Sequence, residues 1–146
     1  MKWHILGAGA QGLLWTHALQ QQGNDVQVIT RQQSGELSGF YQRDADTIPL
    51  RVQAITANTL SDGVSHLIVC VKANQVRDAL QSIKPHIADA AVVLLIQNGI
   101  GAEAIARAVL APSCHIILGC STHGSYRPAP LHVVHAGFGQ MRIGDG

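Results

Sequence analysis

Short apolar runs and amphipathic stretches alternate along most of the chain. The first run, Lys2–Leu6, has the length of a buried strand and ends at Gly7. Gln11–Gln22 then carries apolar residues at a spacing of three and four, which predicts a helix that ends at Gly23. Asp25–Thr30 alternates apolar and other side chains, as a half-buried strand does. The chain therefore opens with a strand, a helix and a second strand.

The same alternation continues through the middle of the sequence. His66–Val71 is a continuous apolar run, typical of a central parallel strand that is covered on both faces. Asn74–Ile83 has the apolar stripe of a helix, and Ala91–Ile96 is another buried strand. Gly101–Leu110 predicts a further helix and His115–Ser121 a further strand.

Two regions lack this clear pattern. Gln32–Thr47 is polar and contains glycine, which predicts a loop with a hairpin around Leu37–Arg43, and Leu50–Ile55 fits a strand. Leu131–Val134 and Gln140–Ile143 predict two short strands. Because strands alternate with helices over most of the chain, we expect an α/β fold. Its form would be a Rossmann-type, doubly wound, mostly parallel sheet with helices on both faces.

The composition is that of one compact domain over residues 1–146. Hydrophobic residues make up 47% and charged residues 13% of the chain. The formal net charge of +1 offers no general attraction to nucleic acid or to an anionic membrane, so neither is expected as a partner. No run reaches the roughly 18 apolar residues of a membrane span. The first strand begins so early that no room is expected for a signal peptide.

The cysteines and histidines do not form a recognisable framework. Cys70, Cys114 and Cys120 are odd in number and include no CxxC pair, which argues against disulfides and zinc and favours a reducing cytoplasm. His132 and His135 are three residues apart on a predicted strand, so they would face opposite sides. No metal site is expected.

A glycine-rich GxGxxG motif joins the first strand to the first helix and consists of Gly7, Ala8, Gly9, Ala10, Gln11 and Gly12. Gly7 would permit a tight turn, Gly9 would let a diphosphate approach the backbone, and Gly12 would allow close packing of helix on strand. Free N–H groups and the positive end of the helix dipole would bind the phosphates. A glycine turn without a ligand is the alternative, which this strand–turn–helix context disfavours.

Arg31 follows the second predicted strand directly. NAD-binding domains usually carry an acid here that binds the ribose hydroxyls. No carboxylate occurs in this sequence until Glu36, and the planar guanidinium of arginine suits a phosphate. A surface arginine at a strand end is the alternative. With the glycine motif beside it, Arg31 predicts NADP(H) as the cofactor.

Three more segments follow buried strands, at the edge where open α/β sheets bind ligands. Lys72 could meet a cofactor ribose, a phosphate or a substrate carboxylate, or could simply be a solvated lysine. Asn98 could bind a ribose hydroxyl and a substrate carbonyl, or could serve only the Asn-Gly turn. His123 has no carboxylate partner in view, so a structural or ribose-contacting role is expected rather than that of proton donor.

These features together resemble the N-terminal domain of the ketopantoate reductase (2-dehydropantoate 2-reductase) family. The resemblance covers nearly the whole chain and rests on the segments GAGAQG, VITR, IVCVKANQV, LLIQNGIG and LGCSTHGS. It implies reduction of 2-dehydropantoate to pantoate by NADPH, for pantothenate and coenzyme A synthesis. The cofactor residues that it implies are the glycine motif, Arg31 for the 2′-phosphate, Lys72, Asn98 and, by a looser match, Ser125. Asn98 would also contact the substrate.

The family has a second, mostly helical domain that supplies a catalytic lysine and an acidic partner. No residue before Gly146 matches that lysine, and Lys72 should not be given its role. We therefore expect this chain to bind NADPH but not to turn over substrate by itself. A keto acid and the missing domain are the expected partners, and the sequence, which is compatible with a homo-oligomer, leaves the oligomeric state open.

Two other functions fit the sequence less well. One is the cofactor half of another NADP-dependent two-domain dehydrogenase, of the 6-phosphogluconate or 3-hydroxyisobutyrate type. The other is a non-catalytic nucleotide-sensing module. Such modules often carry an acid after the second strand, and Arg31 argues against that assignment.

Overall fold

The computed structural model describes residues 1–61, 63–97 and 100–145. Over these residues the chain forms three α-helices, two short 3-10 helices and ten strands. The helices are α1 (Ala10–Gln21), η1 (Ala73–Gln75), α2 (Val76–Ile83), η2 (Lys84–His86) and α3 (Ala102–Val109). The strands are β1 (Lys2–Leu6), β2 (Asp25–Thr30), β3 (Gly35–Arg43), β4 (Asp46–Thr56), β5 (Val64–Val69), β6 (Ile87–Leu95), β7 (His115–Ser121), β8 (Gly124–Ala129), β9 (His132–Gly137) and β10 (Met141–Asp145).

All strands described join one sheet in the order β10-β7-β6-β5-β1-β2-β4-β3-β9-β8. Neighbouring strands run parallel from β7 to β4, and again between β3 and β9. The β10–β7, β3–β4 and β8–β9 pairs are antiparallel. The chain adds strands on one side of β1 and then on the other, so the order reverses at β1. The predicted doubly wound, mostly parallel sheet is confirmed.

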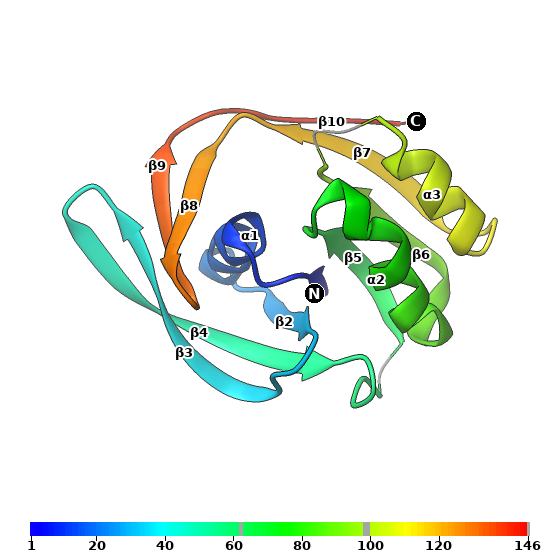
Figure 1. Cartoon of the computed structure of the whole chain (residues 1–146), viewed down its shortest axis with the longest axis horizontal. Coiled ribbons are helices and arrows are strands. Elements are labelled where there is room, and N and C mark those ends of the chain that lie inside the picture. The colour runs from blue at the N-terminus through cyan, green and yellow to red at the C-terminus, as the bar shows by residue number, and fades with distance from the viewer. Residues whose placement is uncertain (62, 98–99, 146) are drawn as a thin grey trace.

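Apolar side chains form a core on each face of the sheet. On one face, Val76 and Leu80 of α2 and Ala106 of α3 pack on β5 and β6. On the other face, Leu13 of α1 packs with Ile5 of β1. Figure 1 shows α2 and α3 on one side and α1 on the other, where β3, β8 and β9 curl around it. Helices on both faces are therefore confirmed.

The segment predicted as a loop, Gln32–Thr47, is mostly part of a long β-hairpin. β3 and β4 pair antiparallel over nine residue pairs, and β4 begins well before the predicted strand Leu50–Ile55. Along β3 the buried positions are Gly39 and Tyr41. The hairpin predicted around Leu37–Arg43 is confirmed but is longer than expected. The loop predicted for the rest of the segment was wrong, because exposed polar residues occupy most of β3 and conceal its period of two.

Strand β8 was also not predicted from the sequence. It lies at an edge of the sheet, pairs with β9, and exposes most of its side chains. An edge strand tolerates Pro128 because its outer N–H groups need no partner in the ladder. Without a buried apolar face, β8 leaves no hydrophobic pattern.

The other predicted elements are confirmed, β1, β2 and β7 with the predicted bounds and the rest with shifted ends. β5 ends at Val69, two residues early, and β6 begins at Ile87 rather than Ala91. The loop after β5 therefore starts at Cys70, which brings this loop to the carboxyl edge of the sheet. In the described part of the chain, no helix is both long and apolar enough to cross a membrane.

Candidate functional site

The glycine motif forms a tight strand-to-helix turn. Gly7 has φ +109°, and a Cβ there would lie 2.9 Å from Cγ1 of Val71. A Cβ on Gly12 would collide with the carbonyl oxygen of Gly7, because α1 packs directly against the end of β1. The turn and the close packing therefore require glycine at both positions, as the sequence predicts.

Gly9 differs because the space around it is open. A Cβ at this position would meet nothing within 4 Å. Gly9 is the N-cap of α1, and no side chain caps the first turn. The N–H groups of that turn are therefore available to an anion. The loop offers both room and hydrogen-bond donors to a phosphate group.

A cleft of about 1030 Å³ opens at the carboxyl ends of β1, β2, β4 and β5. It lies beside β1, where the strand order reverses, which is the place where open α/β sheets bind ligands. The predicted site residues that line this cleft are Gly7, Ala8, Gly9, Arg31 and Lys72. The predicted residues that do not line it are Ala10, Gln11, Gly12 and Ser125.

Arg31 lies in a fixed turn at the end of β2. The Thr30 hydroxyl donates to the carbonyl oxygen of Gln33 (2.6 Å) and accepts from the Gln33 N–H (3.0 Å). Arg31 is exposed, lines the cleft and makes no ion pair with any residue the structure describes. Its guanidinium is therefore available for an anion at this edge of the sheet.

Two further cations line the same cleft. Lys72 is exposed and is the N-cap residue of η1, in the loop that follows β5. Arg127 extends from β8, and its Nη1 donates to the carbonyl oxygen of Ala8 at 3.0 Å. Among the described residues that line the cleft, Asp78 is the one carboxylate, whereas the cations are Arg31, Lys72 and Arg127. The excess of positive charge suits a phosphorylated ligand.

Arg127 is a candidate that sequence reasoning missed. It lies on the unpredicted strand β8, 119 residues from Ala8. Nothing in the local pattern around Pro128 indicates that the chain returns to the glycine motif. The sequence feature that could have identified Arg127 is its positive charge shortly after the predicted strand His115–Ser121.

Cys70 lines the cleft but does not offer a nucleophile. Burial raises the pKa of its thiol well above the usual range. The thiolate is the reactive form of cysteine, and here it is strongly disfavoured. Cys70 therefore contributes a small neutral surface next to Lys72.

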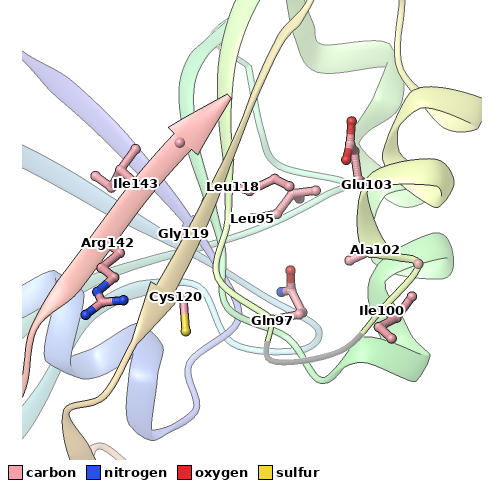
Figure 2. Close-up of a pocket in the computed structure, with 12 residues that line it drawn as sticks. Leu95, Gln97, Ile100, Ala102, Glu103, Leu118, Gly119, Cys120, Arg142 and Ile143 are labelled. Atoms are coloured by element: carbon pink, nitrogen blue, oxygen red, sulfur yellow. The ribbon is translucent and has the colours of Figure 1, made fainter. Parts of the chain in front are cut away.

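Gln97, just after β6, is hydrogen-bonded to the loop that follows β5. Its Nε2 donates to the carbonyl oxygens of Val69 (2.7 Å) and Val71 (3.0 Å), which holds the segment that leads to Lys72. Its Oε1 is buried without a partner among the described residues. Figure 2 shows Gln97 in a second pocket, of about 560 Å³, between β7 and the start of α3. Asn98 comes next but lies outside the described residues, so its role stays a prediction.

Gln11 connects the glycine motif to β8. Its Nε2 donates to Ser125 Oγ at 2.9 Å and to the carbonyl oxygen of His123 at 3.4 Å. Ser125 is therefore held against Gln11 instead of lining the cleft. This bond fixes the strand from which Arg127 extends, two residues further on.

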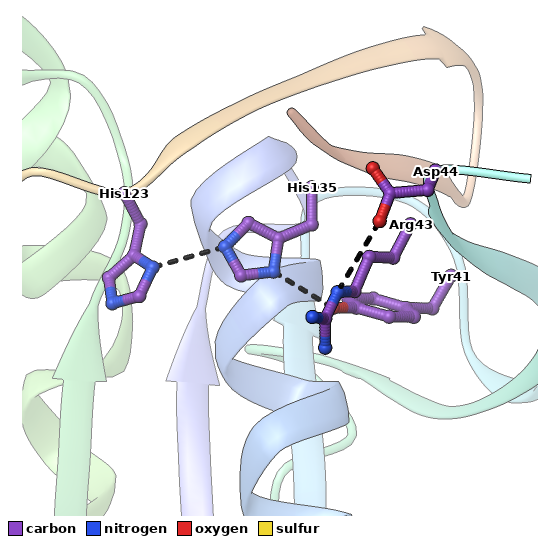
Figure 3. Close-up of polar contacts among 5 residues, drawn as sticks. All are labelled: Tyr41, Arg43, Asp44, His123 and His135. Atoms are coloured by element: carbon purple, nitrogen blue, oxygen red, sulfur yellow. Dashed lines mark hydrogen bonds and ion pairs between the residues drawn. The ribbon is translucent and has the colours of Figure 1, made fainter. Parts of the chain in front are cut away.

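Three side chains form a hydrogen-bonded chain near this junction (Figure 3). Tyr41 Oη lies 2.8 Å from Nδ1 of His135, and Nε2 of His135 lies 3.0 Å from Nδ1 of His123. The Gly139 N–H donates to the same Nδ1 of His123 at 3.2 Å, so that nitrogen carries no proton. His135 must then donate from Nε2, and Tyr41 must donate to its Nδ1. With Nδ1 of His123 accepting these bonds, the proton of a neutral His123 is on Nε2.

These bonds support the structural role expected for His123. Burial lowers the pKa of His135, and the neighbouring His123 lowers it further, which favours the neutral chain. His132 bonds separately, with its Nε2 3.0 Å from Oε1 of Gln42. Across residues 1–61, 63–97 and 100–145, no three His, Cys, Asp or Glu side chains form a group that could hold a metal ion.

Comparison with known proteins agrees with this geometry. The family model described as ketopantoate reductase PanE/ApbA matches residues 3–146. The 2-dehydropantoate 2-reductase of Vibrio cholerae is 33% identical over 141 residues, which cover 96% of this chain and 46% of that protein. The Yersinia pestis enzyme of the same name is 30% identical over 151 residues, with 99% and 46% covered. The chain thus spans about half the length of these relatives.

Solved structures show the same fold. A PanE/ApbA family ketopantoate reductase from Ralstonia eutropha JMP134 superposes with a TM-score of 0.85 at 27% identity, covering 98% of this chain and 49% of that one. A D-mandelate dehydrogenase solved with NADH and anilino(oxo)acetate has a TM-score of 0.86 at 26% identity, with 98% and 48% covered. From the match over residues 3–146, this chain belongs to the ketopantoate reductase family.

Proposed function

We propose that this chain binds NADP(H) as the cofactor domain of an enzyme that reduces 2-dehydropantoate to pantoate. The observation that carries the proposal is the cleft beside β1, which is lined by the glycine turn and by Arg31 at the end of β2. An acid at that edge would favour NAD by binding the ribose hydroxyls, whereas an arginine favours the extra phosphate of NADP.

The residues of the cleft fit such a cofactor. The open space at Gly9 and the uncapped first turn of α1 would receive the diphosphate. Arg31 would bind the 2′-phosphate, and Lys72 a ribose or phosphate oxygen. The nicotinamide half would extend across β1 toward the ends of β5 and β6. Asn98 would meet it there, and Ser125 would support the site through its bond to Gln11.

The bound nicotinamide would supply a hydride to the keto carbon of the substrate. The part played by this chain is to bind the cofactor, to orient it and, through Asn98, to align the substrate with it. A lysine and an acidic partner from a second, helical domain would complete the pocket and protonate the oxygen. The whole enzyme would act in pantothenate and coenzyme A synthesis, in the cytoplasm, where free thiols such as the exposed Cys120 persist.

Cofactor titrations on the 146-residue protein test this proposal. NADPH should bind more tightly than NADH, which can be measured by calorimetry or by the change in nicotinamide fluorescence. Addition of 2-dehydropantoate to the NADPH complex should cause no useful turnover, because the proton donor is expected elsewhere. Tighter binding of NADH, or rapid substrate-dependent oxidation of NADPH, would contradict the proposal.

Reduction of a different 2-keto acid is a second candidate. The similarity to D-mandelate dehydrogenase, with a TM-score of 0.86, supports it because that enzyme was solved with a different oxo acid, anilino(oxo)acetate. A screen of 2-keto acids with a form of the protein that includes a second domain would separate the two. A preference for aromatic 2-keto acids would favour this candidate, and a preference for 2-dehydropantoate the first.

A further inference from the structure

Arg127 is tied to the backbone of the glycine motif. Its Nη1 donates to the carbonyl oxygen of Ala8 at 3.0 Å, and its side chain lines the same cleft as Gly9. Two residues earlier, Ser125 is bonded to Gln11 at 2.9 Å. Two hydrogen bonds therefore hold β8 against the glycine turn. They place the guanidinium of Arg127 beside that turn, in the cleft.

This attachment leaves most of the guanidinium available. An arginine has five N–H donors, and the bond to Ala8 uses one of them. Arg127 is exposed and makes no ion pair with any residue that the structure describes. Its charge therefore has no carboxylate partner on the protein. A guanidinium held in this way is preorganised for an anion at the turn.

The three cations of the cleft have different positions on the sheet. Arg31 follows β2, toward the adenosine end of a dinucleotide, and Lys72 follows β5 on the opposite side of β1. Arg127 is the cation hydrogen-bonded to the glycine turn itself. The diphosphate carries the ligand's central negative charge, and the open space at Gly9 lies at the same turn.

We propose that Arg127 is a diphosphate-binding residue, which β8 contributes to the cofactor site. This assignment depends on the proposed binding of NADP(H). It divides the phosphate recognition of the cleft between two arginines: Arg31 for the 2′-phosphate and Arg127 for the diphosphate. Strand β8 is then a part of the cofactor site and not only an edge of the sheet.

Two ligands distinguish the roles of the two arginines. NADPH contains both the diphosphate and the 2′-phosphate, whereas adenosine 2′-monophosphate contains the 2′-phosphate alone. Arg127→Ala should weaken NADPH binding about tenfold or more, and should change binding of adenosine 2′-monophosphate less than about twofold. Arg31→Ala should weaken both ligands. Dissociation constants from calorimetry at one fixed salt concentration measure these effects.

A second variant separates anion binding from support of the loop. The glutamine of Arg127→Gln keeps amide N–H donors on a shorter side chain and carries no charge. If Arg127 binds the diphosphate, this variant should lose NADPH affinity almost as much as the alanine variant. Wild-type affinity in Arg127→Gln would overturn the proposal, because it would show that no positive charge is needed at this position. This comparison also holds if the alanine variant folds poorly.

Arg107→Ala is the matched control. Arg107 lies on α3, pairs with Glu103 at 2.7 Å and does not line the cleft, but its removal changes the net charge equally. Its NADPH affinity should stay within about twofold of wild type. Equal losses in the Arg107 and Arg127 variants would assign the effect to overall charge and overturn the proposal. Failure of the wild-type protein to bind either ligand would instead refute the proposed function, and this assignment with it.

Discussion

At the scale of single residues, the three glycines of the motif meet different physical requirements. Gly7 adopts φ +109°, and Gly12 lies against the carbonyl oxygen of Gly7, so the tight turn and the close packing of α1 on β1 both require glycine. Gly9 has open space where its side chain would be. The roles that the sequence motif predicts for the three glycines agree with these contacts: the positions that need glycine for the turn and for packing are Gly7 and Gly12, and the position with open space beside the cleft is Gly9.

This separation predicts stability losses of different size for two alanine substitutions. Gly12→Ala should lower the free energy of unfolding by about 1–3 kcal/mol, because its Cβ overpacks a backbone contact. Gly9→Ala should cost about 1 kcal/mol or less, since the residue is an N-cap in open space. The Gly9 variant should nevertheless bind NADPH more weakly than wild type. Urea unfolding and calorimetric titration measure the two effects, and similar stability losses in both variants would contradict this division.

Arg31 carries the prediction of cofactor choice. Arg31→Ala should reduce NADPH affinity by about 1.5–3 kcal/mol, the range for a hydrogen bond to a charged group, and should leave NADH affinity nearly unchanged. The reason is that the 2′-phosphate, which NADH lacks, would be its partner. Titration of the variant with both cofactors checks this. Equal losses of affinity for NADPH and NADH would show that Arg31 does not bind the 2′-phosphate.

At the scale of secondary structure, the elements with a buried apolar face were predictable. β1, β2 and β7 have the predicted bounds, because their apolar residues leave a clear signal in the sequence. β3 was predicted only as a short hairpin around Leu37–Arg43 and β8 was not predicted at all, because pairing with β4 and β9 holds these strands in place rather than a continuous buried face of their own. Tertiary pairing of this kind overrides local pattern and cannot be read from it.

The core contact of α2 gives a test at this scale. Leu80 is fully buried between the helix and the sheet, with 0% of its side chain exposed. Leu80→Ala should lower the free energy of unfolding by about 2–5 kcal/mol, from lost burial and the cavity that remains. Arg77→Ala, on the exposed side of the same helix, should change it by about 0.5 kcal/mol or less. Urea denaturation compares the two, and equal effects would mean that α2 does not pack as described.

At the scale of the whole molecule, the candidate site depends on long-range contacts. The bond between Arg127 and Ala8 joins residues 119 positions apart, and Tyr41 and His135 are 94 positions apart. The glycine motif, Arg31 and Lys72 were predictable because each directly follows a buried strand of a parallel sheet. The return of β8 to the start of α1 was not, because it follows from sheet curvature and not from any local pattern.

The same long-range contacts predict a pH dependence of stability. Burial lowers the pKa of His17 from its usual 6.5, and the nearby His135 lowers it further. Burial and His123 likewise lower the pKa of His135. The unfolded chain would therefore bind protons below about pH 7 while the folded protein stays neutral at these sites. Because the unfolded state binds more protons, the free energy of unfolding should fall as the pH is lowered from about 7 toward the depressed pKa values of the folded state.

Urea unfolding at several pH values between about 5 and 8 measures this dependence, and substitution identifies its source. In His135→Asn the dependence should be smaller than in wild type, although the protein would be less stable at pH 8, because the chain from Tyr41 to His123 is broken. His115→Asn replaces an exposed histidine and should leave the dependence unchanged. A wild-type protein whose stability is constant or rises on acidification would show that these histidines are not held neutral in the folded state. Loss of the dependence in the His115 variant would assign it to the surface instead.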